Sequence, residues 1–264
     1  INHLSLLRTK KLRLCVSRYN RQVIWRDLGI CVKPTLRLCA EIIGLFCAHT
    51  QNDWMRIALN ARHMLVDRLE GLGIVTDEVM GRMAKSHPED QFDYYFDRKY
   101  DQRFVHSTNV TPHTKHPVTR LPILIRYWLD HPVRKDVVKQ KANVFFSPDG
   151  FIPLGMGIPK VSMVHDVAYL RYPEHLQPRI RSFYKKWMPR YLAYTDHIIT
   201  VSEFSKREII AGYNIPADKI SVVYNGITNA YKPVSEEQKK LTRDRYTKGR
   251  PYFVYLGAIH PRKN

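Results

Sequence analysis

Short apolar segments alternate with longer helix-like segments along most of this chain, and this alternation restricts the fold more than any other feature. The strand-like segments are residues 56–62 (ending in a polar turn), 92–96, 104–105, 144–147, 160–164, 197–201, 220–224 and 252–256. The clearest helix-like segments between them are 123–138, 176–193 and 202–210. Strands that alternate with helices are typical of βαβ units, so the pattern predicts an α/β protein with a doubly wound parallel sheet.

Residues 1–54 lack the alternation and show no sustained period of 2 or 3.6. All four cysteines lie in this part, and none of their spacings forms the C-x-x-C pair typical of zinc or redox sites: Cys15, Cys31, Cys39 and Cys47. We expect native translation to begin at Met55 and residues 1–54 to have no folded role. The alternative is a genuine basic N-terminal arm.

The net charge of +19 indicates an anionic partner, which could be nucleic acid, an acidic membrane or a phosphorylated substrate. Residues 1–54 hold nine basic and three acidic residues and supply +6 of this charge. A nucleic-acid-binding protein fits poorly, because the basic residues are dispersed and no helix-turn-helix, zinc finger or RNP motif occurs.

Polar residues follow two of the predicted strands at their carboxyl ends, where open parallel sheets bind ligands. His165 and Asp166 follow the strand at 160–164, and the turn Asn225-Gly226 follows the strand at 220–224. His165 is therefore a candidate for ligand binding. A structural histidine that caps the next turn would give the same pattern.

Two local signals concern helix ends. Gly71 and Gly73 lie in a predicted turn between the first strand and a helix, a geometry that cradles phosphate groups, although a plain tight turn looks the same. Ser202 is a good N-cap for the helix that follows, and Gly212 is placed to end that helix.

Residues 106–122 are rich in His, Thr and Pro and are predicted to form a loop. The spacing of its histidines matches no usual metal site, so no metal is expected: His106, His113 and His116. The basic helix at 176–193 has two interpretations. Its aromatic side packs on the sheet, which we favour, or the helix lies on a membrane surface.

Several motifs occur in a fixed order along about 100 residues: VHD at 164–166, YPE at 172–174, DHIITVSEFSK at 196–206, VVYNG at 222–226, PYFVYLG at 251–257 and PRKN at 261–264. In these motifs the chain from Met55 onward resembles the bacterial family-4 (group 1) retaining glycosyltransferases of the GT-B fold, many of which are mannosyltransferases. The similarity is weaker over 55–143 and absent over 1–54.

The resemblance implies two Rossmann-like domains that face each other across a cleft. Residues 55–232 would form the N-terminal, acceptor-side domain, and 233–250 the connector. Residues 251–264 would begin the C-terminal domain that binds the nucleotide-sugar, with most of it beyond Asn264. The family's donor-binding glutamates would also lie there, so we expect residues 1–264 alone to lack transferase activity.

The implied reaction moves a hexose, such as mannose, from a GDP- or UDP-sugar to a glycan or lipid-linked acceptor with retention, in cell-surface polysaccharide or lipopolysaccharide synthesis. It needs neither a metal nor a cofactor. His165 and Asp166 would be catalytic, and the donor would be bound by Gly71, Gly73, Ser202, Asn225, Gly226, Gly257, Arg262 and Lys263. Ala258 stands where many members carry an arginine.

The implied location is the cytoplasm, with peripheral attachment to the inner face of the cytoplasmic membrane. Two alternatives stay open. One is a GT-B-fold sugar-nucleotide epimerase, and the other is a basic binding protein without catalytic activity.

Overall fold

The structure is a computed structural model that describes residues 54–65, 67, 69–226, 232–255 and 257. Its strands are β1 (Arg56–Asn60), β2 (Gln91–Phe96), β3 (Val110–Thr114), β4 (Val144–Ser147), β5 (Lys160–Val164), β6 (His197–Thr200) and β7 (Ile220–Val222). Its helices are α2 (Gly71–Ser86), α3 (Pro122–Trp128), α4 (Arg134–Lys139), α5 (Pro178–Tyr194), α6 (Glu203–Tyr213) and α7 (Glu236–Thr247). Residues Leu129–Val133 form a π-helical turn around Pro132, between α3 and α4. Residues 1–53, with the four cysteines, lie outside the described residues, and so does the expectation that residues 1–54 have no folded role, apart from Trp54.

The seven described strands form one parallel sheet in the order β3-β2-β1-β4-β5-β6-β7. The chain adds strands outward from β1 to β3, returns to place β4 beside β1, and then adds strands in the opposite direction. The predicted doubly wound parallel sheet is confirmed. The order reverses between β1 and β4, and such a switch point opens a crevice at the carboxyl ends of the two strands.

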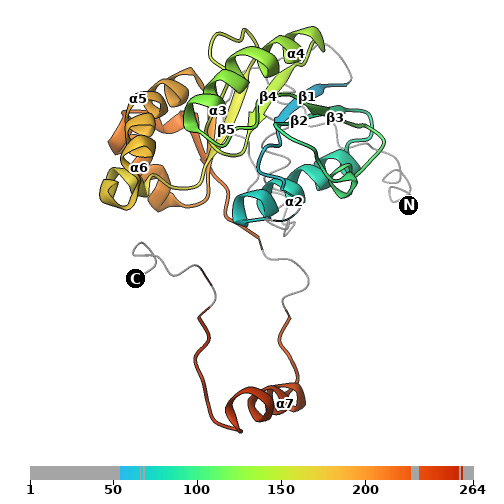
Figure 1. Cartoon of the computed structure of the whole chain (residues 1–264), viewed down its shortest axis with the longest axis vertical. Coiled ribbons are helices and arrows are strands. Elements are labelled where there is room, and N and C mark those ends of the chain that lie inside the picture. Colours follow the sequence, from blue (N-terminus) through green and yellow to red (C-terminus); the bar gives the residue numbers. More distant parts are fainter. Residues whose placement is uncertain (1–53, 66, 68, 227–231, 256, 258–264) are drawn as a thin grey trace, which may run out of the picture.

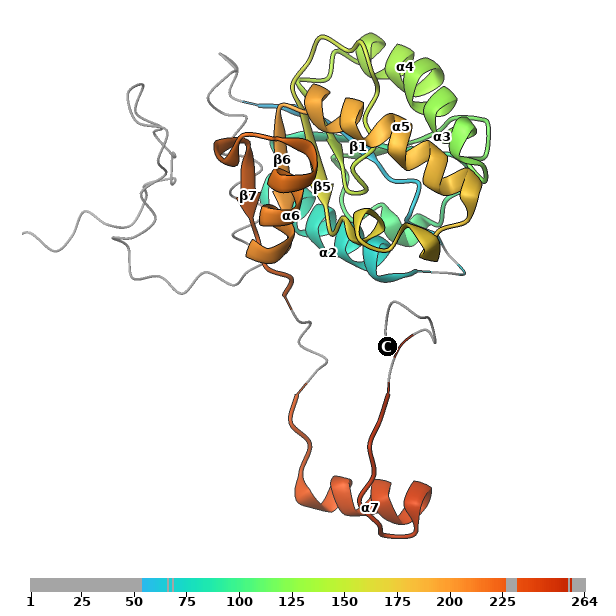
Figure 2. The same ribbon diagram turned by 90° about the vertical axis from the view of Figure 1, so that its left-hand side faces the viewer.

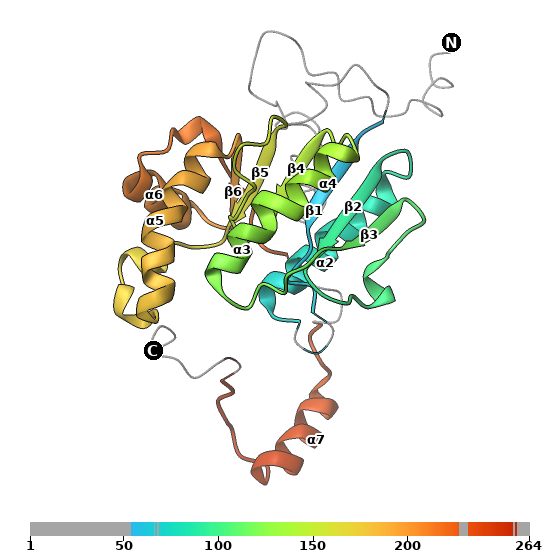
Figure 3. The same cartoon turned by 45° about the horizontal axis from the view of Figure 1, so that its top comes forward.

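Helices cover both faces of the sheet, and α2 lies on the face opposite α3 and α4 (Figure 3). A hydrophobic core lies on each face of the sheet, and successive residues of β1 belong to different cores. Ile57 packs with α2, and Ala58 packs with the helices of the other face. The strands carry nearly continuous apolar runs because both of their faces are buried. The last four residues of β1, 57–60, are therefore buried.

Helix α5 contributes Phe183, Trp187 and Tyr191 to the second core, while its basic residues are exposed. The interpretation that the aromatic side of this helix packs on the sheet is confirmed. Pro189 lies within the helix, which nevertheless continues to Tyr194.

Four local predictions are wrong, besides the turn predicted at Gly71 and Gly73 that is described with the site. Residues 104–105 form no strand, because Phe104 ends a 3₁₀ turn (Gln102–Phe104) and packs in the core. The predicted loop 106–122 contains edge strand β3, which tolerates Pro112 since an edge position needs fewer ladder donors. Gly212 does not end its helix. Helix α6 continues to Tyr213 and is closed by Asn214, whose φ of 52° is left-handed.

The fourth error concerns the apolar run at 252–256, of which residues 252–255 are described as irregular and exposed instead of strand-like. A strand needs a neighbour to satisfy its backbone, and the described residues offer none there. This segment follows α7, which has no buried residue and stands apart from the sheet (Figures 1 and 2).

Candidate functional site

The carboxyl ends of β1, β4 and β5 bring a group of polar side chains together at the switch point of the sheet. Arg62 and His63 follow β1, Asp149 follows β4, and His165 follows β5. Open parallel sheets bind ligands at the carboxyl ends of their strands. The ends of β1 and β4 are therefore candidate ligand positions, as is the end of β5, which His165 follows.

Asp149 is the centre of this group, and its side chain is 4% exposed. Its Oδ2 accepts hydrogen bonds from Arg62 Nε at 2.7 Å and His63 Nε2 at 2.9 Å. Its Oδ1 accepts from Asn60 Nδ2 (3.1 Å), Ser147 Oγ (2.8 Å) and the Phe151 backbone N–H (3.0 Å). Both carboxylate oxygens are therefore fully used within the protein.

Burial raises the pKa of Asp149, but the charge of Arg62 and the hydrogen bond from His63 outweigh burial and hold the pKa well below its usual range. Asp149 is a permanent anion at neutral pH. It ties the loop after β1 to the loop after β4.

His165 lies beside this cluster. Burial lowers its pKa, and a hydrogen bond with the Pro148 backbone opposes that effect. Its Nε2 is buried and has no hydrogen-bond partner among the described residues.

The backbone around His165 is anchored to α6. Ser202 caps this helix by accepting from the Ser205 N–H at 3.0 Å, and Ser205 Oγ donates to the His165 carbonyl at 3.0 Å. Asp166 is exposed, and its Oδ1 accepts from the Ala168 N–H at 3.1 Å. The predicted N-cap role of Ser202 is confirmed, and its hydroxyl also helps to fix the residue next to the crevice.

Gly71 and Gly73 do not lie in a turn before the helix, as predicted, but within the first turn of α2. A Cβ on Gly73 would lie 2.5 Å from the His63 carbonyl oxygen, so α2 begins in direct contact with the loop that carries Arg62 and His63. Around Gly71 the space is open. The positive end of α2 therefore borders the crevice.

The remaining predicted donor-binding residues are not brought to this cluster by any described contact. Asn225 and Gly226 are exposed after β7. Gly257 is exposed in the segment that follows α7. Arg262 and Lys263 lie outside the described residues.

Sequence analysis missed Arg62, His63, Asp149 and Tyr184. The Tyr184 pKa is raised to about 12, first by burial and then by the charge of Asp149. Its ring packs on that of Tyr169, whose hydroxyl lies 2.6 Å from that of Tyr213. A usable signal was present for Asp149, which comes two residues after a predicted strand.

Two histidines of 106–122 form hydrogen bonds with carboxylates inside the domain: His106 with Asp77 (2.7 Å) and His113 with Asp93 (2.9 Å). Within the described ranges no group of three or more His, Cys, Asp or Glu residues could hold a metal ion. In the same part of the chain, no helix combines the length and the hydropathy that crossing a bilayer requires.

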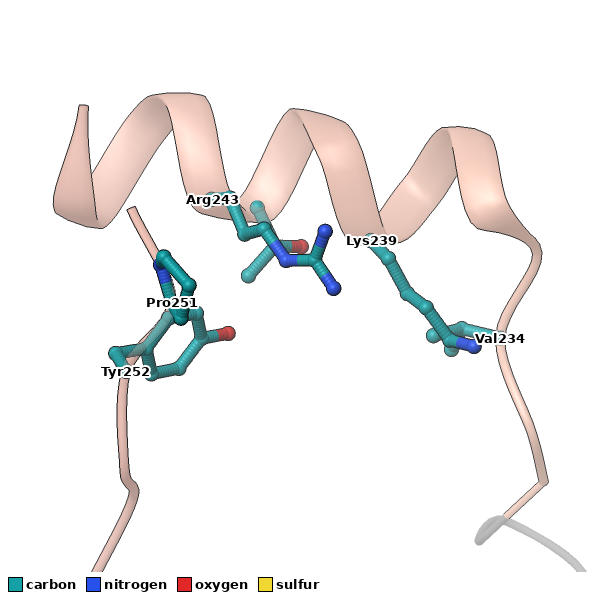
Figure 4. A pocket seen from close by; sticks show the side chains of 6 residues that line it. Val234, Lys239, Arg243, Pro251 and Tyr252 are labelled. Carbon is teal, nitrogen blue, oxygen red and sulfur yellow. The ribbon is translucent and has the colours of Figure 1, made fainter. Parts of the chain in front are cut away.

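A shallow pocket of about 390 Å³ lies away from the sheet, between α7 and the segment that follows it (Figure 4). It is lined by Val234, Lys239, Thr242, Arg243, Pro251 and Tyr252. It contains none of the predicted site residues, and its position on an exposed helix separates it from the switch-point crevice.

The family model of Glycosyltransferase Family 4 matches residues 65–230. The chain belongs to this family. It is 31% identical over 150 residues to the O-antigen chain mannosyltransferase B of Escherichia coli, and the aligned region covers 55% of this chain and 39% of that protein. It is 27% identical over 101 residues to the O-antigen chain mannosyltransferase RfbU of Salmonella typhimurium, covering 38% of this chain and 25% of that protein. The chain thus spans well under half the length of these two relatives.

Among solved structures, the apo form of the lipopolysaccharide outer core galactosyltransferase WaaB matches with a TM-score of 0.45 and 16% identity, over 66% of this chain and 46% of that one. Anabaena Alr3699/HepE in complex with UDP and glucose matches with a TM-score of 0.45 and 18% identity, over 73% and 50%. The fold assignment rests on the strand order and on the family match.

Proposed function

We propose that this chain supplies the acceptor-binding half of a retaining glycosyltransferase. The enzyme would move a hexose, mannose in the first instance, from a GDP- or UDP-sugar to a glycan or lipid-linked acceptor in the synthesis of lipopolysaccharide or another cell-surface polysaccharide. Residues 55–232 would form this half, 233–250 the connector, and 251–264 the beginning of the donor-binding half. Membership of Glycosyltransferase Family 4 favours a transferase over an epimerase or a binding protein without activity.

The unpartnered Nε2 of His165 is the observation that carries the proposal. It is a buried polar nitrogen at the edge of the sheet where ligands bind, and it has no partner among the described residues. A sugar hydroxyl would satisfy it by donating a hydrogen bond. Charge develops on the sugar as the leaving group departs, and a positioned acceptor beside a carboxylate stabilises that charge.

The departing nucleoside diphosphate needs positive groups. The first turn of α2, with Gly71 and Gly73, offers backbone N–H groups and a positive helix end beside the crevice. Ser202, Asn225, Gly226, Gly257, Arg262 and Lys263 stay proposed donor contacts, and Asp166 a proposed catalytic residue. A phosphate oxygen of the donor would accept the proton of the attacking hydroxyl on the same face of the sugar, without a metal or a cofactor.

Binding of the acceptor tests this proposal in the chain itself. We expect α-mannosides titrated into ¹⁵N-labelled protein to shift the resonances of Arg62, His63 and His165, and to leave those of α7 unchanged. Shifts confined to α7, or none at saturating mannoside, would contradict an acceptor site at the switch point.

Transfer is tested separately. We expect residues 1–264 alone to transfer no mannose from GDP-mannose, and sugar transfer by the purified chain would refute that expectation. Joined to the donor half of the E. coli mannosyltransferase B, residues 55–264 should support transfer, and His165→Ala should lower the rate by on the order of 10²-fold. Asp97→Asn is the matched control, because Asp97 pairs with Arg98 and Thr119 beyond β2 and is expected to leave transfer intact.

The outer face of α5 supports peripheral attachment to an acidic membrane. Its basic side chains are exposed opposite the buried aromatic side: Arg179, Arg181, Lys185, Lys186 and Arg190. Each basic residue near an anionic surface contributes about 1 kcal/mol to binding. Vesicles with acidic lipid should bind the chain, and neutral vesicles should not.

The matched variants locate this attachment. Replacing Arg179, Arg181, Lys185 and Lys186 by Gln should abolish vesicle binding, whereas replacing Lys232, Lys240, Arg243 and Arg245 near α7 by Gln should preserve it. Equal binding of the chain to neutral and acidic vesicles, or equal loss in both variants, would refute attachment through α5.

A further inference from the structure

Arg62 and His63 follow β1 and both bind Asp149, but only His63 stays available to a ligand. The Arg62 side chain is 9% exposed, and its Nε and Nη2 both bind Asp149 Oδ2. The His63 side chain is 29% exposed, although its Nε2 lies 2.9 Å from the same oxygen. Arg62 is therefore used inside the protein, whereas part of the His63 ring is open at the switch point.

The described groups that bind Asp149 are all hydrogen-bond donors. Besides the guanidinium of Arg62, Asn60 Nδ2 donates to its Oδ1 at 3.1 Å, and so does the Phe151 N–H at 3.0 Å. A carboxylate surrounded by donors is ionised and can only accept hydrogen bonds. The bond with His63 is therefore donated by Nε2–H, which leaves Nδ1 of the neutral ring as an acceptor.

The other ring nitrogen, Nδ1 of His63, has no hydrogen-bond partner in the described part of the chain. Unlike Nε2 of His165, it is not buried. An open acceptor nitrogen binds a donor such as a sugar hydroxyl, and it repels a phosphate oxygen that carries no proton. The ligand chemistry that fits this nitrogen is therefore a hydroxyl and not the diphosphate of the donor.

His63 also lies beside the first turn of α2. A Cβ on Gly73 would lie 2.5 Å from the His63 carbonyl oxygen, so this residue borders the helix end proposed for the donor diphosphate. The space around Gly71 is open. A sugar bound to His63 would thus lie next to the phosphate oxygen that is proposed to take a proton from the acceptor.

We propose that His63 is an acceptor-binding residue. Its Nδ1 accepts a hydrogen bond from a hydroxyl of the acceptor sugar that does not react, while Asp149 holds the ring through Nε2–H. The reacting hydroxyl then remains free to give its proton to the donor phosphate. The identity of the ligand as an acceptor sugar rests on the proposed function, whereas the protonation of His63 on Nε2 does not.

The first test uses the chain without any sugar. NMR of ¹⁵N-labelled histidine distinguishes the two tautomers, because protonated and unprotonated ring nitrogens resonate in well-separated regions. At pH 8, above the ordinary histidine value of about 6.5, we expect His63 to carry its proton on Nε2. A His63 ring that is protonated on Nδ1 at this pH would overturn the proposal.

The second test adds methyl α-mannoside, which we expect to move the Nδ1 resonance of His63. His63→Gln keeps an amide donor for Asp149 but has no acceptor at the Nδ1 position. This variant should therefore weaken mannoside binding about 10-fold, the effect of one lost hydrogen bond, and leave the urea midpoint close to that of the wild-type chain.

His106→Gln is the matched control. Nε2 of His106 likewise lies on a carboxylate, 2.7 Å from Asp77 Oδ1. A Cβ on Gly81 would lie 2.8 Å from the His106 ring, which places this ring at the middle of α2 and not at its first turn. This variant should bind mannoside as the wild-type chain does.

Deoxy sugars identify the hydroxyl. Among methyl α-mannosides that each lack one hydroxyl, we expect one to bind the wild-type chain about 10-fold more weakly than the parent sugar. The same analogue should bind His63→Gln as well as the parent sugar does, because both changes remove the same hydrogen bond and their effects do not add.

Three results would overturn the inference. They are a saturating mannoside that shifts Arg62 and His165 but not Nδ1 of His63, a folded His63→Gln that binds mannoside like the wild-type chain, and additive losses for every deoxy sugar. The first leaves the proposed acceptor site intact, whereas no shift at any switch-point residue would refute that site and this inference together. Should His63→Gln fail to fold, the Nδ1 resonance of the wild-type chain decides the question.

Discussion

Arg62 Nε lies 2.7 Å from Asp149 Oδ2, and this ion pair joins the end of β1 to the end of β4 across 87 residues of sequence. Both side chains are almost completely buried, with 9% and 4% exposure. A buried charged contact therefore holds the carboxyl ends of these two strands together at the switch point.

Removing Arg62 should be costly. Arg62→Met leaves the Asp149 carboxylate buried without its main counter-charge, and we expect a loss of about 3–5 kcal/mol in the free energy of unfolding measured in urea. Arg171→Met is the control, because its bidentate pair with Glu208 is exposed and should contribute little. Equal losses for the two variants would contradict the buried-network interpretation.

His197 should make stability depend on pH. Burial first, and then the charge of Lys206, lower its pKa to about 4 from the ordinary histidine value of 6.5. Between these values the unfolded state binds more protons than the folded state. The contribution is present above pH 6.5 and is lost as the pH falls towards 4, with a slope of at most about 1.4 kcal/mol per pH unit.

His197→Gln removes this titration. Urea midpoints at pH 7 and pH 5 should differ less for the variant than for the wild-type chain, and His165, whose pKa is also lowered, should supply a remaining decrease. A variant that loses as much stability as the wild-type chain between these two pH values would show that His197 does not titrate in this way.

Gly71 and Gly73, in the first turn of α2, form a matched pair. Gly73→Ala places a Cβ 2.5 Å from the His63 carbonyl oxygen and 2.8 Å from Leu69 Cδ1, and we expect a loss of about 1–3 kcal/mol on thermal or urea unfolding. Gly71→Ala enters open space and should be neutral or stabilising by up to about 1 kcal/mol. The reverse order would mean that α2 does not contact the Arg62–His63 loop.

Ser202 can be tested as a helix cap. Ser202→Ala removes the acceptor of the Ser205 N–H and should lower the free energy of unfolding by about 1 kcal/mol. Ser202→Asn supplies another capping acceptor and should restore most of that loss. If Asn fails to rescue, then the hydroxyl contributes through its contact with Ser205 Oγ and not through the cap.

Much of the fold was predictable because it depends on local pattern. The apolar segments at 144–147, 160–164 and 197–201 are strands, with the last one residue shorter, and the amphipathic segment at 176–193 is a helix. The exceptions are informative. Strand β3 carries Pro112 and polar residues that only an edge position accepts, and the apolar run at 252–256 has no described neighbour to pair with.

The candidate site was predictable only in part. His165 could be found because it follows an apolar run directly, and Ser202 because an N-cap is a local signal. Arg62 ends one predicted strand and Asp149 follows another by two residues, but the sequence does not show that these two strand ends are neighbours.

By itself, the sequence determined that this chain alternates strands with helices, and its ordered motifs indicated the family. Tertiary structure decided which strand ends become neighbours. Periodicity reports which side of a segment is buried, but the pairing of β1 with β4 follows from the packing of the whole sheet. That pairing joins Arg62 to Asp149 at the carboxyl ends of the two strands.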